Sequence, residues 1–265
     1  EEVGKSVKKF KVGDKVYSRP NESSLGTMAE YVVSNIEDTA LMPSNLNFDE
    51  SASIPVVGLT TYQAFVDIAK LSKGESILIH AGSGGVGTFA IQLAKHLGAK
   101  VTTTTSTKNI SFVKSLGADK VIDYTSQNYL DEGAVFDVVY DTLGSNYTLD
   151  SFKVLKNGGR VVSIAGTVDS ITAEQIGLNR FIRMILSFQA RKVTKTAAKM
   201  NAMYRFLFMS PNGDQLEELA KLYESGSIKP LIDKVYNFDE GVQALEYLAK
   251  GRAKGKVIVK IREDI

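Results

Sequence analysis

Three glycines in this sequence have the spacing of a phosphate-binding turn. Gly82, Gly84 and Gly87 follow the apolar run 76–80 and open a segment with the pattern of an amphipathic helix. Gly82 permits a tight turn, Gly84 lets the backbone approach a phosphate, and Gly87 lets the helix pack closely on the strand. The free N–H groups of the first helical turn and the positive end of the helix dipole would bind an anion. The pattern predicts a site for the pyrophosphate of a dinucleotide.

The end of the next predicted strand, 100–105, indicates which dinucleotide fits. In sheets of this type that bind NAD, an Asp or Glu at this place accepts a hydrogen bond from the ribose 2′-hydroxyl. Here the chain continues Thr105-Ser106-Thr107-Lys108-Asn109, without a carboxylate. Hydroxyl and ammonium groups would accommodate a 2′-phosphate, which a carboxylate would repel. We therefore predict NADP(H) as the cofactor, bound in part by Thr105, Ser106 and Lys108.

The composition excludes several other kinds of site. The 265 residues include no cysteine and two histidines, so a thiolate zinc site, a catalytic thiol and a disulfide framework are all excluded. His80 lies in a predicted strand and is expected to be buried, whereas His96 lies on a predicted helix and is expected to be solvated. We predict no metal site. A net charge of +2 gives no general case for nucleic-acid binding.

The sequence contains no run close to the ~20 apolar residues of a membrane span. Its first residues do not resemble a signal peptide, so we expect a cytoplasmic protein. One stretch is unusual, because no acidic residue occurs between Glu174 and Asp214. The basic residues of this stretch are Arg180, Arg183, Arg191, Lys192, Lys195, Lys199 and Arg205. It is either a solvated basic helix beside a buried one, or an element for an anionic partner, such as a peripheral membrane contact through 180–205.

Strands and helices alternate through the middle of the chain. The predicted strands are 76–80, 100–105, 120–123, 135–140 and 160–165, and helices lie near 85–97, 108–116 and 146–156. This alternation predicts an α/β fold with a doubly wound parallel sheet. A further strand is expected at 204–208. Outside this region, we expect short strands at 15–19, 30–33 and 256–260, and helices at 58–70, 213–223 and 239–250, with a helix cap near Asp49 and Glu50.

Several motifs together resemble a known family. They are Gly13-Asp-Lys-Val-Tyr17, Gly26-Thr-Met-Ala-Glu-Tyr-Val-Val33, Gly58-Leu-Thr60-Thr-Tyr62, the loop 81–87, Ser115-Leu-Gly-Ala-Asp119, Asp141-Thr-Leu-Gly144 and Gly255-Lys256-Val. Over nearly its whole length the chain resembles the zinc-free quinone oxidoreductase branch of the medium-chain dehydrogenase/reductase superfamily, with plant enone reductases among its nearest relatives. The resemblance implies a Rossmann domain, 56–212, inserted between two parts of a GroES-like substrate domain, 1–55 and 213–265. It also implies that about the first 60 residues of the family's chain are missing here.

The resemblance implies hydride transfer from NADPH to a quinone or to the β-carbon of an α,β-unsaturated carbonyl, without zinc. It also implies a homodimer joined through edge strands. The implied cofactor contacts are Gly82, Gly84, Gly85, Val86 and Gly87 at the pyrophosphate, Ser106, Lys108 and Tyr124 at the adenosine phosphate, Thr60, Leu143, Ala165 and Gly166 at the nicotinamide, and Lys256 near the cleft. Tyr17 and Tyr62 are the candidate proton donors, although both could simply pack.

Three other functions were weighed against this one. A short-chain reductase needs Tyr-x-x-x-Lys, and none of the eleven tyrosines is followed four residues later by lysine. An enoyl-thioester reductase for an acyl carrier or coenzyme A stays open, because the basic stretch could form its entrance. A non-enzymatic NADPH-binding protein with a redox-sensing or structural role also stays open.

Overall fold

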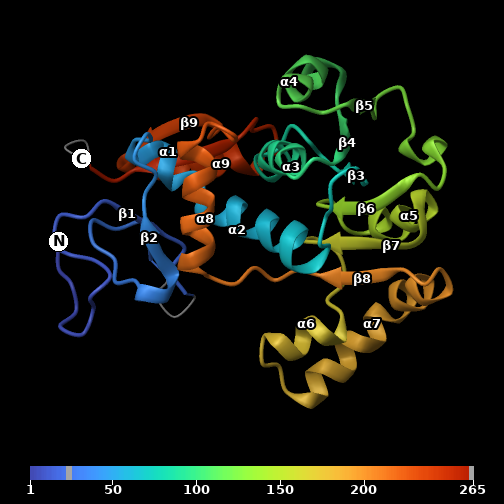
Figure 1. Cartoon of the computed structure of the whole chain (residues 1–265), viewed down its shortest axis with the longest axis horizontal. Coiled ribbons are helices and arrows are strands. Elements are labelled where there is room, and N and C mark those ends of the chain that lie inside the picture. Colours follow the sequence, from blue (N-terminus) through green and yellow to red (C-terminus); the bar gives the residue numbers. More distant parts are fainter. Residues whose placement is uncertain (22–25, 263–265) are drawn as a thin grey trace. The chain divides into compact units, whose positions relative to one another are not determined.

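The computed structural model describes residues 1–21 and 26–262, and the chain forms two compact units. Unit 1 combines Glu1–Leu59 with Met209–Ile265, and unit 2 is the continuous segment Thr60–Phe208. Figure 1 follows the chain through both units and labels their helices and strands.

Unit 2 is built on one sheet of six strands, all parallel. The strands are β3 (Ser76–Ile79), β4 (Lys100–Thr105), β5 (Lys120–Asp123), β6 (Phe136–Asp141), β7 (Leu155–Ser163) and β8 (Met203–Phe206). Their order in space is β5-β4-β3-β6-β7-β8, so the direction of winding reverses between β3 and β6. In sheets of this kind, ligands bind outside the carboxyl ends of the strands at such a reversal. The predicted doubly wound parallel sheet, with its sixth strand, is confirmed.

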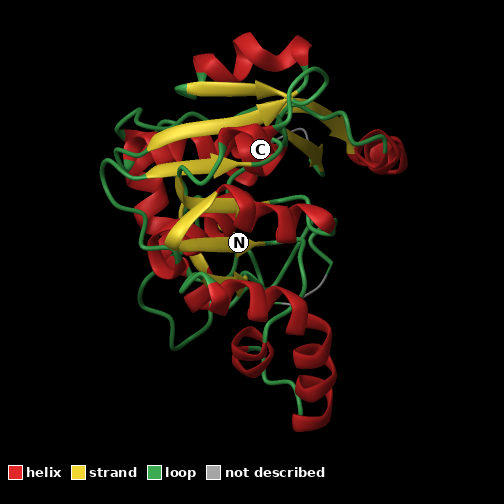
Figure 2. Ribbon diagram, turned by 90° about the vertical axis from the view of Figure 1, so that its right-hand side faces the viewer, coloured by secondary structure: helices red, strands yellow, loops and turns green. Residues whose placement is uncertain are grey.

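Helices follow the strands of this sheet in alternation. They are α3 (Gly85–His96), α4 (Ile110–Ser115), α5 (Asn146–Val154), α6 (Ser170–Gln175) and α7 (Arg180–Lys199). Right-handed crossovers place the helices that follow β3 and β4 on one face and those that follow β6 and β7 on the other. The helices α6 and α7 project from the sheet, at the lower side of Figures 1 and 2.

The strands of unit 2 are apolar because the sheet is buried on both faces. Ile77, Leu78 and Ile79 of β3 have no exposed surface, and neither have Val138 and Val139 of β6. The threonine-rich β4 is buried as well, since its hydroxyls find acceptors inside the sheet: Thr103 Oγ1 donates to Ile79 O at 2.7 Å. Continuous apolar strands are typical of parallel sheets covered on both sides.

Unit 1 contains two small sheets. The strands β1 (Val16–Ser18) and β2 (Thr39–Leu41) pair antiparallel, while β9 (Ile232–Asn237) and β10 (Lys256–Lys260) pair parallel. Its helices are α1 (Phe48–Ala52), α8 (Gly213–Glu224), α9 (Gly241–Ala249) and the first turns of α2 (Pro55–Tyr62), which continues into unit 2 as the π-helical turn η3 (Gln63–Ile68).

One local expectation in unit 1 was wrong, and another was confirmed. Residues 30–33 do not form a strand, because no strand of the described chain runs beside them, and Val33 is 83% exposed. The helix cap expected near Asp49 and Glu50 is present at the start of α1, where Asn47 is the N-cap residue and Glu50 is its partner. The Asn47 side chain accepts from Glu50 N at 2.9 Å, and the Glu50 carboxylate accepts from Asn47 N at 3.0 Å. This reciprocal pair is a capping box, which satisfies two backbone donors at the helix start.

Candidate functional site at the carboxyl edge of the sheet

The glycine loop after β3 is tight enough to require its glycines. A Cβ atom on Gly82 would lie 2.1 Å from Thr103 Oγ1, and one on Gly87 would lie 2.3 Å from Ala81 O. Around Gly84, by contrast, the nearest atom to a Cβ would be Ala81 O at 3.4 Å. Gly82 and Gly87 are therefore fixed by packing inside the protein, whereas the bare backbone of Gly84 is available for a ligand to approach.

The helix that follows this loop begins without a side-chain cap. Its N-cap is Gly84, which offers no side chain to cap the amides of the first turn, and this turn starts with Gly85, Val86 and Gly87. The amides of these three positions have no acceptor within the helix. Together with the positive end of a twelve-residue helix they form a site for an anion such as a phosphate.

Polar side chains surround the end of β4, beside the glycine loop. Ser83 Oγ accepts from Thr105 Oγ1 at 2.9 Å and from Asn109 Nδ2 at 3.1 Å, and Asn109 Nδ2 also lies 3.3 Å from Ser106 Oγ. The Lys108 ammonium is exposed and forms no ion pair or hydrogen bond with any residue in the described part of the chain. A phosphate at this place could accept hydrogen bonds from neutral hydroxyl and amide groups and pair with the Lys108 ammonium.

The two residues at the end of the neighbouring strand β5 complete this side of the site. Tyr124 is 64% exposed, and its N–H donates to Thr105 O at 3.1 Å, so its backbone lies beside the end of β4. The carboxylate of Asp123 accepts from Thr107 Oγ1 and from the N–H and hydroxyl of Thr125. These bonds hold the pKa of Asp123 below its usual value. No carboxylate stands at the end of β4 itself, as the sequence indicated.

A buried carboxylate organises the loops on the other side of the reversal point. Asp141, the last residue of β6, has no exposed surface. Its Oδ1 accepts from Leu143 N at 3.0 Å and Gly144 N at 2.8 Å. Its Oδ2 accepts from Thr148 Oγ1 at 2.5 Å and Ser163 Oγ at 2.8 Å. Four donors thus compensate the charge, as a buried carboxylate requires.

The same network fixes the loop that follows β7. Ser163 Oγ, which donates to Asp141, accepts from Gly166 N at 2.8 Å and from Ala165 N at 3.3 Å. The two loops also touch, since a Cβ on Gly144 would lie 2.0 Å from Ala165 O. Leu143 and Ala165 themselves are exposed. The structure therefore brings together three of the predicted nicotinamide contacts, Leu143, Ala165 and Gly166, on one rigid backbone support.

His80 is buried at the end of β3, as expected, and His96 is exposed at the end of α3. The His80 ring packs edge-on against Tyr129 and Tyr147, with centroids 4.8 and 5.6 Å away. Burial lowers the pKa of His80 to about 4, against the opposing effect of the Asp141 carboxylate, so the ring is neutral near pH 7. Among the described residues, no three His, Cys, Asp or Glu side chains lie close enough to hold a metal ion.

The remaining predicted site residues are placed as follows. In unit 1, the buried Tyr17 hydroxyl donates to Leu216 O at 2.5 Å, and burial lowers the pKa of Lys256. In unit 2, Thr60 is buried and Tyr62, the last residue of α2, is half-buried. The proton of Tyr17 is thus held by the protein backbone, which fits the packing role better than the catalytic one.

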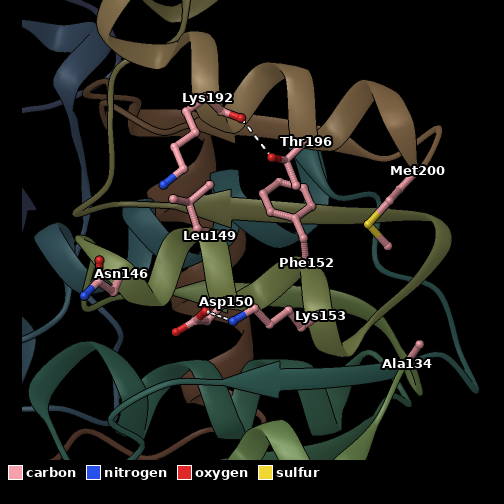
Figure 3. A pocket seen from close by; sticks show the side chains of 9 residues that line it. All are labelled: Ala134, Asn146, Leu149, Asp150, Phe152, Lys153, Lys192, Thr196 and Met200. Atoms are coloured by element: carbon pink, nitrogen blue, oxygen red, sulfur yellow. Dashed lines mark hydrogen bonds and ion pairs between the residues drawn. The ribbon is translucent and has the colours of Figure 1, made fainter.

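A groove of about 710 Å³ lies between α5 and α7, away from these residues. Figure 3 shows Leu149, Phe152 and Met200 as its apolar lining, with Lys192 reaching in from α7. Asp150 and Lys153 form an ion pair at 2.7 Å along one side. None of the predicted cofactor contacts lines this groove.

The central role of Asp141 can be tested by replacing its charge. We expect Asp141→Asn to lower the free energy of unfolding by about 1.5–3 kcal/mol, because hydrogen bonds to an ionised group are lost. Asp137→Asn is a matched control on the same strand, since Asp137 is half-buried, pairs with the exposed Lys156 and accepts one backbone N–H, from Ser76 at 2.8 Å. It should cost less, about 1 kcal/mol or below. Urea unfolding measures both, and equal losses would contradict the assignment.

Comparisons with known proteins agree with this geometry. A family model described as "Zinc-binding dehydrogenase" matches residues 116–259. The 2-methylene-furan-3-one reductase of Solanum lycopersicum is 38% identical over 97% of this chain and 60% of its own length. The mitochondrial NAD(P)H oxidoreductase RTN4IP1 of Danio rerio is 35% identical over 99% of this chain and 70% of its own. The chain thus spans 60% to 70% of the length of these two curated relatives.

Among solved structures, the quinone oxidoreductase from Coxiella burnetii superimposes with a TM-score of 0.82 at 32% identity, over 98% of this chain and 76% of that one. A quinone oxidoreductase from Pseudomonas syringae superimposes with a TM-score of 0.79 at 25% identity. These matches and the motifs of the sequence point to the same branch of proteins. The chain belongs to the zinc-binding dehydrogenase family of the medium-chain dehydrogenase/reductase superfamily, in the branch of quinone and enone reductases.

Proposed function

We propose that this chain binds NADP(H) at the carboxyl edge of the unit 2 sheet and reduces a quinone or an α,β-unsaturated carbonyl. One observation carries the proposal: the uncapped start of α3 and the Asp141-ordered loops stand on β3 and β6, on the two sides of the winding reversal. The relatives named above as enone and quinone reductases support the same activity. We also propose that unit 2 is the Rossmann domain and unit 1 the two parts of a GroES-like domain.

The residues of unit 2 fit the cofactor, whose bound form would supply the hydride. The amides of Gly85, Val86 and Gly87 would hold the pyrophosphate, and Gly82 would keep the turn narrow. Ser106 and Lys108 would bind the 2′-phosphate, with Thr105 supporting the loop and Tyr124 beside the adenosine. Leu143, Ala165, Gly166 and Thr60 would line the nicotinamide. The place of Lys256 near the cleft stays a prediction from the resemblance.

The reduction needs an apolar place for the nicotinamide and a donor for the oxygen on which charge develops. The Asp141 network supports the apolar place, because it holds loops 142–144 and 164–166 in one conformation without placing its own charge on the surface. The proposed donor for the oxygen is the Tyr62 hydroxyl. Tyr17 is left out, since its hydroxyl already donates to Leu216 O.

The zinc in the family's name does not fit this chain. There is no cysteine, His80 is buried in the sheet, and His96 is exposed at the far end of α3. We therefore derive no step through a metal ion. Without zinc to polarise an alcohol, reduction of a conjugated carbonyl is the easier reaction, because the negative charge can spread to oxygen.

The preference for NADPH can be tested at Lys108. We expect Lys108→Gln to weaken NADPH binding roughly tenfold, because a charge-assisted hydrogen bond to phosphate is lost, and to leave NADH binding unchanged. Lys114→Gln is the control, since Lys114 is also exposed but lies on α4, away from the end of β4. Titration of nicotinamide fluorescence measures the dissociation constants. Tighter binding of NADH by the unmodified protein would contradict the proposal.

The acceptor can be tested by following NADPH oxidation by the full-length protein with a 2-alkenal, a naphthoquinone and crotonyl-coenzyme A. We expect the first two to be reduced faster. A preference for the thioester would instead support an enoyl-thioester reductase, a possibility favoured by the 34% identity to the trans-enoyl reductase pgmF of Aspergillus terreus. Tight NADPH binding with no turnover of any acceptor would support a non-enzymatic role.

We propose a homodimer joined through β8, which lies at the end of the sheet and pairs only with β7 among the described strands. An open strand edge is a ready surface for pairing with a second copy. Light scattering should give twice the chain mass of 28.9 kDa, and a mass of one chain would contradict this.

The cytoplasmic location expected from the sequence stays a prediction, testable by imaging the tagged full-length protein. No helix of the described chain is long and apolar enough to cross a membrane.

A further inference from the structure

The helix α7 has one face that unit 2 covers and one that it does not. Ala190, Val193 and Ala197 are buried, and the last two belong to the core that includes Phe152 and Tyr204. On the opposite face, Phe181, Met184, Ile185 and Phe188 are 67%, 61%, 43% and 74% exposed. Their spacing of three and four residues places them in one stripe along the first half of the helix.

The same stripe becomes cationic in the second half of the helix. Continuing by three and four residues from Phe188, it passes through Arg191, Lys192, Lys195 and Lys199, all exposed. None of these four charged groups forms an ion pair with a residue that the structure describes. The nearest basic residue outside the stripe, Arg183, does have a partner, since it lies 2.8 Å from Glu174.

Two kinds of partner could cover this stripe, and its charge distinguishes them. A second copy packed antiparallel about the middle of α7 would place the four cations of each helix against the aromatic half of the other. A parallel arrangement would place cations against cations. The stripe offers no carboxylate to compensate either arrangement, because the sequence has no acidic residue from 175 to 213. An anionic lipid surface supplies both an apolar layer and negative charge.

We propose that α7 is a membrane-docking element, which lies in the plane of a bilayer rich in anionic phospholipids. Phe181, Met184, Ile185 and Phe188 insert between the acyl chains, while Arg191, Lys195 and Lys199 contact the headgroup phosphates. Lys192 instead reaches into the groove between α5 and α7. The helices α6 and α7 project from the sheet (Figures 1 and 2), so α7 lies at the periphery of unit 2. None of these residues belongs to the cofactor site, so docking is independent of the proposed reaction.

The test is flotation of the protein with vesicles of phosphatidylcholine, with and without phosphatidylglycerol. We expect binding to the anionic vesicles only, with a partition coefficient that falls at least about tenfold when high salt screens the cations. Phe181→Ser with Phe188→Ser, and separately Arg191→Gln with Lys195→Gln, should each reduce binding by a similar factor or more. Both pairs are exposed, so the thermal unfolding midpoint should stay unchanged and confirm that the variants are folded.

The matched control is an exposed apolar segment of unit 1, where Tyr31 and Val33 are 67% and 83% exposed and residues 26–38 include no lysine or arginine. Tyr31→Ser with Val33→Ser should leave vesicle binding unchanged. Absence of binding to anionic vesicles at low salt would overturn the proposal, and so would equal losses in this control and in the α7 variants. Conversion of a dimer to a monomer by the Phe181 and Phe188 substitutions, without an effect on vesicles, would assign the stripe to a second copy instead.

Discussion

The carboxylate of Asp141 is the interaction on which the proposed site depends. It is fully buried, and it gathers two backbone amides, two hydroxyls and, through Ser163, two further amides into one network. Removing any one donor would leave part of a buried charge without compensation. The loops after β6 and β7 are therefore coupled, because Asp141 binds the amides of the first loop and also accepts from Ser163, which binds the amides of the second. Loops that are held by several hydrogen bonds in this way can present a ligand surface without rearranging.

The two strands beside the winding reversal also share a backbone feature. Ala81 after β3 has a φ of 52°, and so has Ser145 after β6. Residues with side chains rarely adopt such angles, and those that do need support from their surroundings. Ala81 has that support, because its N–H donates to Thr104 Oγ1 and its carbonyl accepts from Gly84 N. Both turns occur where the chain leaves the sheet toward the proposed cofactor. The unusual backbone angles of unit 2 at these two turns thus lie at the edge of the sheet where the cofactor is proposed to bind, and not within its strands.

Much of unit 2 could be predicted from sequence, since short runs of strand composition alternate with helical segments, and Gly98, Gly117 and Gly158 mark several of the breaks between them. Prediction failed where tertiary partners decide the outcome. Residues 30–33 have strand composition but no neighbour to pair with, and the role of Tyr17 depends on a carbonyl 199 residues away. Asp141 was part of a quoted motif, yet nothing in the sequence showed that its carboxylate would be buried under four donors. For 180–205, one interpretation of the sequence was a solvated basic helix beside a buried one, but residues 180–199 form the single helix α7, whose Phe181 and Phe188 are exposed.

The uncapped first turn of α3 links the proposed cofactor to the lifetime of the fold. A helix that lacks a capping side chain begins with amides that only solvent or a ligand can satisfy. A phosphate bound there would stabilise the folded chain alone, by an amount that grows with the logarithm of the free ligand concentration. If the chain binds NADP(H) as proposed, its resistance to unfolding and proteolysis would rise and fall with the free NADP(H) concentration in its compartment. A shortage of NADPH would then reduce the amount of protein as well as its turnover.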